Sequence, residues 1–453
     1  MTEAREPNKK VKFIDDYSEL YAKIFERDVR SFEYFRDIQI GLLSEIKRKS
    51  LPEIAKVVGL GDGQELHHFI AESPWKVEEL RERRLELTKE LLKDQKIIIG
   101  VDETGDKKKG SITDYVARQY IGNIGKVEQG IVSVNIYAII DNITIPLLFQ
   151  VYKPKKRLKL INKGDKEERE EYLTKPQIAI ELIKEIISKG FNIELVVGDS
   201  IYGESRYFVS ELEKLKLNYI LATHSNHSVE IEEGKKLRYT TFTKYERKLA
   251  DGKIEIRFIR EIIYGQRKSN RYFQVCNEPL LSPNDSSYYF LTNLNGNIKK
   301  IVGNLYGFRT WIEYAFRQSK FQLGWNHFRF THYSNIERWW ELCFVAYLLV
   351  SCHSSFLVSR LLSIYQNHSI SFTSNDSITN NIVASSISFT EHPSWKVSKS
   401  WVNTLHNLRL IIQPVISLSL LISWIKIFHI SELFIGFDKL LSFMNYFSII
   451  HLL

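Results

Sequence analysis

Cysteine is scarce in this chain. Only Cys276, Cys343 and Cys352 occur among 453 residues, and no two of them form a Cys-x-x-Cys pair. Cysteines so few and so widely spaced argue against a disulfide framework and against a structural zinc site. We therefore expect a protein of a reducing, cytosolic compartment.

Uninterrupted apolar runs are missing as well. The first residues, MTEAREPNKKVKF, carry charges that no apolar run follows, so we expect no signal peptide. The longest apolar stretches lie at 343–350 and 415–430, and serine, lysine and histidine interrupt the second. Because a bilayer requires about 20 uninterrupted apolar residues, both stretches are predicted as buried core helices, with a membrane span as the lesser alternative.

The overall composition is that of a folded globular protein, with 44% apolar and 26% charged residues. The chain exceeds the usual single-domain length, which predicts one large core with smaller domains attached. Lys and Arg total 63 against 54 for Asp and Glu, a net charge of +9. This balance favours polyanionic partners but does not by itself establish nucleic-acid binding.

The first part of the chain, from about residue 28 to 93, is predicted to be helical because apolar residues recur there at helical spacing. Within it, segments 50–60 and 61–73 predict two short helices around a glycine turn. This pattern fits a helix-turn-helix, and it fits plain helical packing at least as well. The apolar positions are Phe35, Ile38, Leu42, Leu43 and Ile46.

From Ile97 the period changes, and three strands are predicted at 96–102, 131–140 and 144–152. A helix at 175–190 and a buried strand at 192–200 follow. This order predicts an α/β fold with a mixed sheet and helices on its faces, as RNase H-like domains have. Strand-like segments between 226 and 290 are too long for a simple connection and predict a β-rich insertion.

The later part of the chain predicts a helical run from 298 to 323 with Gly324 just beyond it, and another helix through 336–351. Residues 364–390 are rich in Ser, Thr and Asn and predict a loop before a terminal helical segment. The expected domains are an N-terminal helical, DNA-binding region at 1–93, core segments at 94–225 and 291–360, the insertion at 226–290, and a loop with C-terminal helices at 361–453.

Three carboxylates stand out in this arrangement. Asp102 and Asp199 each follow an apolar strand, where α/β sheets bind ligands, although Asp also ends strands as an ordinary capping residue. Glu313 is more informative, because on one continuous helix it would share an arc of roughly 60° with three other polar residues. These are Tyr306, Arg309 and Lys320. The alternative is an ordinary surface pair of Arg309 and Glu313, contributing about 0.2–0.5 kcal/mol.

The spacing Y-x2-R-x3-E-x6-K, formed by Tyr306, Arg309, Glu313 and Lys320, resembles the YREK motif of insertion-sequence-four-type transposases. The segments VDETGDKKKG, DYVARQYIGNIGK and VVGDSIYG are similar to the two aspartate regions of the insertion-sequence-701 branch of that group. The similarity runs from about residue 28 to the end of the chain.

The resemblance implies a DDE transposase with an RNase H-like core, in which Asp102, Asp199 and Glu313 bind two Mg²⁺ ions, with Mn²⁺ able to substitute. Three carboxylates supply the hard oxygen ligands that such ions prefer. It also implies that Tyr306, Arg309 and Lys320 hold DNA near the cut. The implied partners are double-stranded DNA at inverted repeats and target sites and a second copy of the chain, in a bacterial cytoplasm at the nucleoid and away from membranes.

Further basic residues are candidates for DNA contact if they lie near the carboxylates, with a solvated loop as the alternative. They include Lys155, Lys156 and Arg157 within a cluster that also contains Lys153, Lys159 and Lys163, the run Lys107 to Lys109, and Arg118 with Tyr120. Glu103 is left outside the triad because adjacent strand residues point to opposite faces. His224, His227, His327 and His332 fit no metal-ligand spacing, and Ser200 lacks the frame of a hydrolase nucleophile.

We therefore expect a transposase that cleaves DNA strands and transfers them at the ends of an insertion sequence. The alternatives are an RNase H-like nuclease without joining activity and a catalytically inactive DNA-binding relative, against which the intact carboxylates count. Relatives that cleave through a DNA hairpin hold a flipped base with an aromatic residue, often tryptophan. No tryptophan lies between Trp75 and Trp311, so such a residue would here be Phe or Tyr.

Overall fold

The computed structural model describes residues 10–445, except 123, 142, 164–165, 228–235, 249–253, 265–269, 280–286, 369, 371–388, 398–399 and 429. The chain forms two compact units. One combines Met1–Lys93 with Arg317–Leu453, and the other is the continuous segment Asp94–Phe316.

The described residues of the Asp94–Phe316 unit form a mixed sheet of eleven strands. The order is β10-β11-β12-β13-β8-β7-β1-β3-β2, with β4 paired to β3 and β9 to β11. Strand β1 is parallel to β7, and β7 to β8, whereas the other pairings are antiparallel. The strands are β1 (Ile97–Lys107), β2 (Ala117–Ile121), β3 (Lys126–Ile140), β4 (Ile143–Val151), β7 (Ile193–Gly198), β8 (Tyr219–Thr223), β9 (Leu237–Tyr239), β10 (Thr243–Lys248), β11 (Ile254–Tyr264), β12 (Arg271–Cys276) and β13 (Tyr288–Thr292).

This sheet confirms the predicted mixed α/β fold. The expected strands correspond to β1, β3, β4 and β7, whereas the short edge strand β2 was not expected. The described residues between 226 and 290 form β9 to β12 and part of β13, and these strands extend the core sheet through the pairing of β13 with β8.

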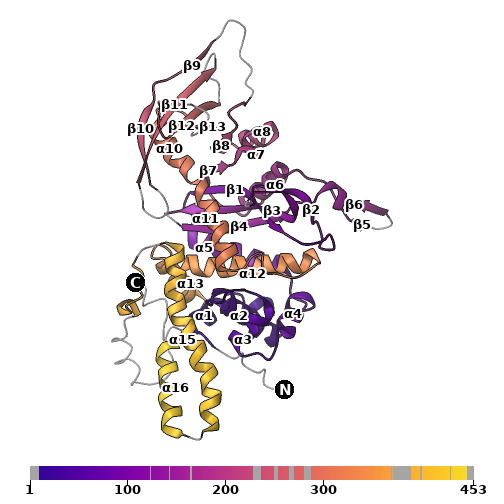
Figure 1. Ribbon diagram of the computed structural model, residues 1–453, viewed down its shortest axis with the longest axis vertical. Coiled ribbons are helices and arrows are strands. Elements are labelled where there is room, and N and C mark those ends of the chain that lie inside the picture. Colours follow the sequence, from indigo (N-terminus) through magenta and orange to yellow (C-terminus); the bar gives the residue numbers. More distant parts are fainter. Residues whose placement is uncertain are drawn as a thin grey trace. The chain divides into compact units, whose positions relative to one another are not determined.

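Helices cover both faces of this sheet (Figure 1). Helices α6 (Lys175–Ser188), α7 (Ser200–Gly203) and α8 (Arg206–Lys214) follow the early strands in the chain, and α10 (Lys299–Gly307) and α11 (Arg309–Arg317) follow the last. Helix α6 begins at a capping box of Thr174 and Gln177, and Gly190 just after its end has a φ of +79°. Ile298, Val302 and Trp311 are buried against strands β7, β8 and β11 to β13.

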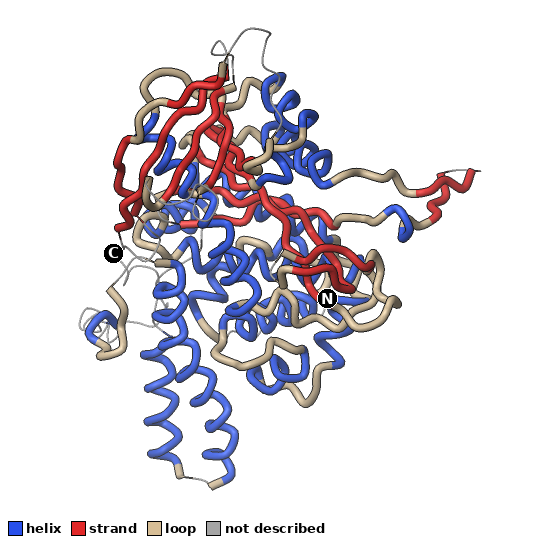
Figure 2. The backbone as a smooth tube through the Cα atoms, turned by 45° about the horizontal axis from the view of Figure 1, so that its top comes forward, coloured by secondary structure: helices blue, strands red, loops and turns tan. Residues whose placement is uncertain are grey.

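A separate two-stranded hairpin projects from this unit between β4 and α6. It consists of β5 (Leu160–Lys163) and β6 (Lys166–Arg169), preceded by the short helix η2 (Lys155–Arg157). Figure 2 shows the hairpin standing away from the main sheet at the end of its connecting loops. We call residues 153–172 the basic arm, because it contains the predicted lysine and arginine cluster.

The other unit is helical. Its elements are α1 (Lys12–Glu19), η1 (Ala22–Phe25), α2 (Val29–Leu43), α3 (Leu51–Val58), α4 (Gln64–Ala71), α5 (Val77–Leu92), η3 (Gln318–Gln322), α12 (Tyr333–Cys352), α13 (Val358–Asn367), η4 (Phe389–Glu391), α15 (Trp401–Ile427) and α16 (Ser431–Asn445). The two predicted short helices are α3 and α4, joined through Gly59 with a φ of +79°. The exposed side chains of α4 include Gln64, Glu65, His67 and His68 but no lysine or arginine.

The two late apolar stretches differ in burial. Helix α12 is a buried core helix as predicted, with Leu342 to Cys352 almost fully inaccessible. The prediction is wrong for the second half of α15, where Trp424 and Ile427 are more than 60% exposed. By length and composition α15 could also cross a bilayer, a test that core helices of soluble proteins pass too. Most of the predicted 364–390 loop lies outside the described residues.

Candidate active site

The two aspartates lie side by side at one edge of the parallel part of the sheet. In the β1–β7 pairing Val101 lies opposite Gly198, so the next residues along the two strands are Asp102 and Asp199. Asp102 is 9% exposed and accepts a hydrogen bond from the Glu103 amide at 2.8 Å. Asp199 caps α7 and accepts from the Ser200 amide at 2.5 Å. The parallel crossover through α6 therefore brings together carboxylates that are distant in sequence.

The glutamate lies on α11, but the predicted continuous helix from 298 to 323 is wrong. The helical run is interrupted at Phe308, between α10 and α11, and it ends in the π-helical turn η3. The four residues of the motif are therefore distributed over three elements, and the 60° arc does not hold for them all. Arg309 and Glu313 remain on one helix, and Gly324 follows with a φ of +71°, as expected of a residue that ends a helix.

Arg309 joins the carboxylates. Its Nη2 atom lies 3.4 Å from Oδ2 of Asp199 and 3.5 Å from Oε1 of Glu313. The side chains of the arginine, aspartate and glutamate are 23%, 37% and 46% exposed, so the cluster faces solvent on one side. Arg309 and Glu313 do pair at i, i+4, as the surface-pair alternative had it, but the arginine also contacts Asp199 from another element.

Burial dominates the electrostatics of the first aspartate. The pKa of Asp102 is raised well above its usual value, chiefly because burial removes water from the carboxylate, with repulsion from Glu103 and Asp199 adding to the effect. The positive charge of Arg309 opposes this shift. A cation is therefore most valuable beside Asp102, where the negative charge is least solvated.

Three residues beside this site were not predicted to belong to it. Glu103 was set aside, and Lys175 and Tyr202 were not singled out from the sequence. The Glu103 carboxylate accepts from Lys175 Nζ of α6 at 3.0 Å and from the Tyr202 hydroxyl of α7 at 3.5 Å. Tyr202 is fully buried, and burial together with the charges of Glu103, Asp102 and Asp199 raises the pKa of its hydroxyl well above the usual value. Its position three residues after Asp199 was the available signal.

The donor set suits a divalent metal ion in its chemistry. Three carboxylates from β1, the β7 end and α11 surround one cationic group, and hard divalent cations prefer such oxygen ligands. The spacing is wider than a metal site requires, since no three His, Cys, Asp or Glu side chains within the described ranges stand close enough to hold an ion. Arg309 occupies the position between the second and third carboxylates.

The other predicted DNA contacts belong to elements other than α11. Arg118 is exposed on β2, the edge strand beyond β3. Lys155, Lys156 and Arg157 form η2 in the basic arm, and the side chain of Tyr306 lies outside what the structure describes. Lys320 lies in η3, within the helical unit, where its side chain is 5% exposed.

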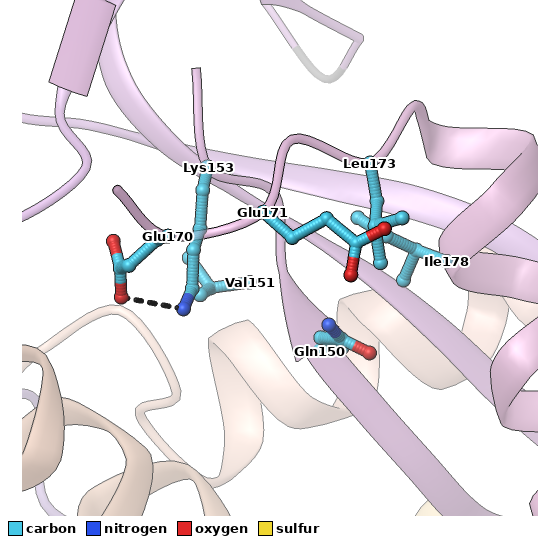
Figure 3. Close-up of a pocket in the computed structure, with 7 residues that line it drawn as sticks. All are labelled: Gln150, Val151, Lys153, Glu170, Glu171, Leu173 and Ile178. Carbon is cyan, nitrogen blue, oxygen red and sulfur yellow. Dashed lines mark hydrogen bonds and ion pairs between the residues drawn. The ribbon is translucent and has the colours of Figure 1, made fainter. Parts of the chain in front are cut away.

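A cavity of about 230 Å³ lies at the root of the basic arm, lined by Gln150, Val151, Lys153, Glu170, Glu171, Leu173 and Ile178. Figure 3 shows Lys153 paired with Glu170 at its rim, at 2.8 Å, and Glu171 directed toward Gln150. No carboxylate of the candidate triad lines this cavity. Two glutamates in its wall make it unsuited to a phosphate, so it adds nothing to the site at Asp102.

Comparison with known proteins connects this geometry to a family. A family model described as DDE superfamily endonuclease matches residues 19–240, and one described as transposase DDE domain matches residues 174–349. The chain is 50% identical over 338 residues to a probable transposase for insertion sequence element IS701 from Microchaete diplosiphon, an alignment covering 74% of this chain and 87% of that protein. The DDE endonuclease domain is RNase H-like, which confirms the expected fold class, and such domains generally use divalent metal ions. The chain therefore belongs to the DDE transposases, in their IS701-like branch.

Proposed function

We propose that this protein catalyses metal-dependent cleavage and transfer of DNA strands at the ends of an insertion sequence. In this reaction it binds inverted repeats, hydrolyses one strand and joins the freed 3′-hydroxyl to target DNA. The observation that carries the proposal is the convergence of Asp102, Asp199 and Glu313 around Arg309 from distant parts of the chain.

Each residue of the cluster has a separate task in this proposal. Asp102, Asp199 and Glu313 would hold two Mg²⁺ ions, which Mn²⁺ can replace. When bound, such ions supply activation of the attacking oxygen and stabilisation of the leaving oxygen. Arg309 would contact a DNA phosphate near the cut, since guanidinium groups bind phosphate oxygens in bidentate fashion. Tyr306 and Lys320 are proposed for the same DNA segment.

The protein's partners follow from this reaction. Double-stranded DNA binds through the active site and, we propose, through the exposed lysines of the basic arm and Arg118 on β2. Two element ends must be cut and joined together, so we propose that the active complex contains two copies of the chain. Such a protein acts at the nucleoid, in the bacterial cytoplasm.

The decisive experiment incubates purified protein with Mg²⁺, duplexes carrying the element's ends, and a target plasmid. Wild type is compared with Asp102→Asn and Glu313→Gln, which remove a negative charge while preserving size. We expect cleaved ends and strand-transfer products from wild type and a loss of at least about 10²-fold in both variants. Cleavage without joined products would favour a nuclease, and undiminished products from both variants would contradict the assignment.

A further inference from the structure

In the described part of the chain, Arg309 forms ion pairs with two members of the candidate triad, Asp199 and Glu313. Its guanidinium reaches Asp199 at 3.4 Å and Glu313 at 3.5 Å, and its charge also acts on Asp102. The arginine therefore lies where the negative charge of the site is concentrated.

The guanidinium and a metal ion cannot share this position. Mg²⁺ binds carboxylate oxygens at about 2.0–2.1 Å and demands a compact octahedral arrangement. In the structure the space between Asp199 and Glu313 holds the Arg309 guanidinium, whose Nη2 atom lies 3.4 Å from Oδ2 of Asp199 and 3.5 Å from Oε1 of Glu313. The carboxylates must release Arg309 before they can close around an ion.

Releasing the arginine has a cost that DNA can offset. When the guanidinium leaves Asp199 and Glu313, it gives up two ion pairs. A DNA phosphate can replace them, because it offers two oxygens in the geometry that a guanidinium group prefers. Arg309 is the first residue of α11, directly after the interruption at Phe308, and its side chain is 23% exposed. From this position it can turn toward solvent while Glu313, one turn along, remains on the helix.

We infer that Arg309 is a positioning residue that keeps the carboxylates of the free protein from closing on metal and moves to a phosphate when DNA binds. Metal and DNA then bind cooperatively, because each favours the state in which Arg309 has left Asp199 and Glu313. By linkage, DNA must raise metal affinity by the same factor as metal raises DNA affinity. This inference rests on the proposed function of the three carboxylates as metal ligands.

The test measures Mn²⁺ binding to the full chain by electron paramagnetic resonance, with and without a short DNA duplex. The variants are Arg309→Ala and Arg309→Gln, with Arg317→Ala as the matched control, because Arg317 is an exposed arginine at the end of the same helix. Asp199→Asn tests the metal site itself. Circular dichroism and thermal melting establish that each variant is folded.

We expect the duplex to tighten Mn²⁺ binding by wild type and by Arg317→Ala on the order of tenfold. Both Arg309 variants should bind Mn²⁺ more tightly than wild type without DNA and lose most of the response to the duplex. Equal affinities and equal DNA responses in wild type and both variants would overturn the inference while leaving the proposed function intact. Unchanged Mn²⁺ binding by Asp199→Asn would instead overturn the proposed metal site, and the inference with it.

Discussion

At the scale of single residues, a buried carboxylate of the helical unit forms ion pairs with two arginines. Glu341 of α12 is fully buried and accepts from both Arg84 and Arg81 of α5. Arg81 also reaches Glu337 at 2.6 Å, near the surface. Breaking a buried pair leaves an uncompensated charge, which costs far more than loss of an exposed pair.

Substitution of Glu341 by Gln should therefore destabilise the protein by about 3–5 kcal/mol, because the buried guanidinium of Arg84 loses its counter-charge and Arg81 keeps only Glu337. Glu337→Gln is the matched control, since its side chain is 20% exposed, and it should cost no more than about 1 kcal/mol. Urea unfolding followed by circular dichroism gives both values. Equal losses in the two variants would contradict this account.

A buried histidine makes stability depend on pH. Burial lowers the pKa of His353 to about 4, from 6.5, while its Nδ1–H donates to the Leu349 carbonyl at 2.8 Å. Because the folded pKa is the lower one, the unfolded chain binds more protons between pH 6.5 and 4. The stability contributed by neutral His353 is present above pH 6.5 and is lost as the pH falls toward 4.

His353→Asn removes this proton linkage. Between pH 7 and pH 4, wild type should lose about 3 kcal/mol more of its free energy of unfolding than the variant does. Urea midpoints at several pH values measure the difference. Parallel pH profiles for the two proteins would show that His353 does not titrate as described.

At the scale of elements, the basic arm combines two kinds of cation. Arg157 donates to the backbone carbonyls of Ser111 and Thr113, at 2.6 and 3.0 Å, so it holds a neighbouring loop. Lys155 lies 4.6 Å above the Tyr172 ring and remains exposed, as Lys156 does. The arm thus offers exposed lysines on a base fixed by the arginine.

The joint substitution Lys155→Ala and Lys156→Ala should lower the slope of log affinity for DNA against log salt by about 2, since each phosphate contact contributes about 0.9. Arg157→Ala should change that slope less and should speed proteolysis at the 111–113 loop. Fluorescence anisotropy at several salt concentrations measures the slopes. A larger slope change for Arg157→Ala than for the lysine pair would reverse these roles.

At the scale of the whole molecule, helices α15 and α16 expose many apolar side chains. Helices α15 and α16 form an antiparallel pair (Figure 2), and apolar side chains on its outside are 42–65% exposed. They include Leu420, Leu421, Trp424, Ile427, Phe428, Leu433 and Ile435. Two such helix pairs from two copies would complete a four-helix bundle, which fits the proposed dimer.

Replacement of Trp424 and Phe428 by Gln should therefore shift the protein toward monomer, measured by sedimentation velocity across a range of concentrations. Because both side chains are more than 60% exposed, the melting temperature of the monomer should change little. Val397→Gln is the control, as Val397 is 91% exposed outside the helix pair. An association constant unaffected by the double substitution would place the dimer interface elsewhere.

Local sequence patterns predicted much of the fold of this protein. Apolar runs predicted strands β1, β3, β4 and β7, and helical spacing predicted α6, and together these elements predicted the mixed sheet. Both patterns depend on residues that are close together in the sequence. The sequence also indicated both aspartates as strand-end residues and Glu313 as a residue of a helix. These features depend on short-range preferences, which the amino acids carry with them.

Tertiary structure decided the rest, because it depends on contacts between distant residues. The interruption at Phe308 separates Tyr306 from Arg309, and helical spacing alone gave no sign of it. The parallel register of β1 and β7 sets Asp102 beside Asp199, and only the packing of α11 against the sheet brings Arg309 to the second aspartate. The sequence by itself determined which carboxylates this protein has, and the fold decided that an arginine stands among them.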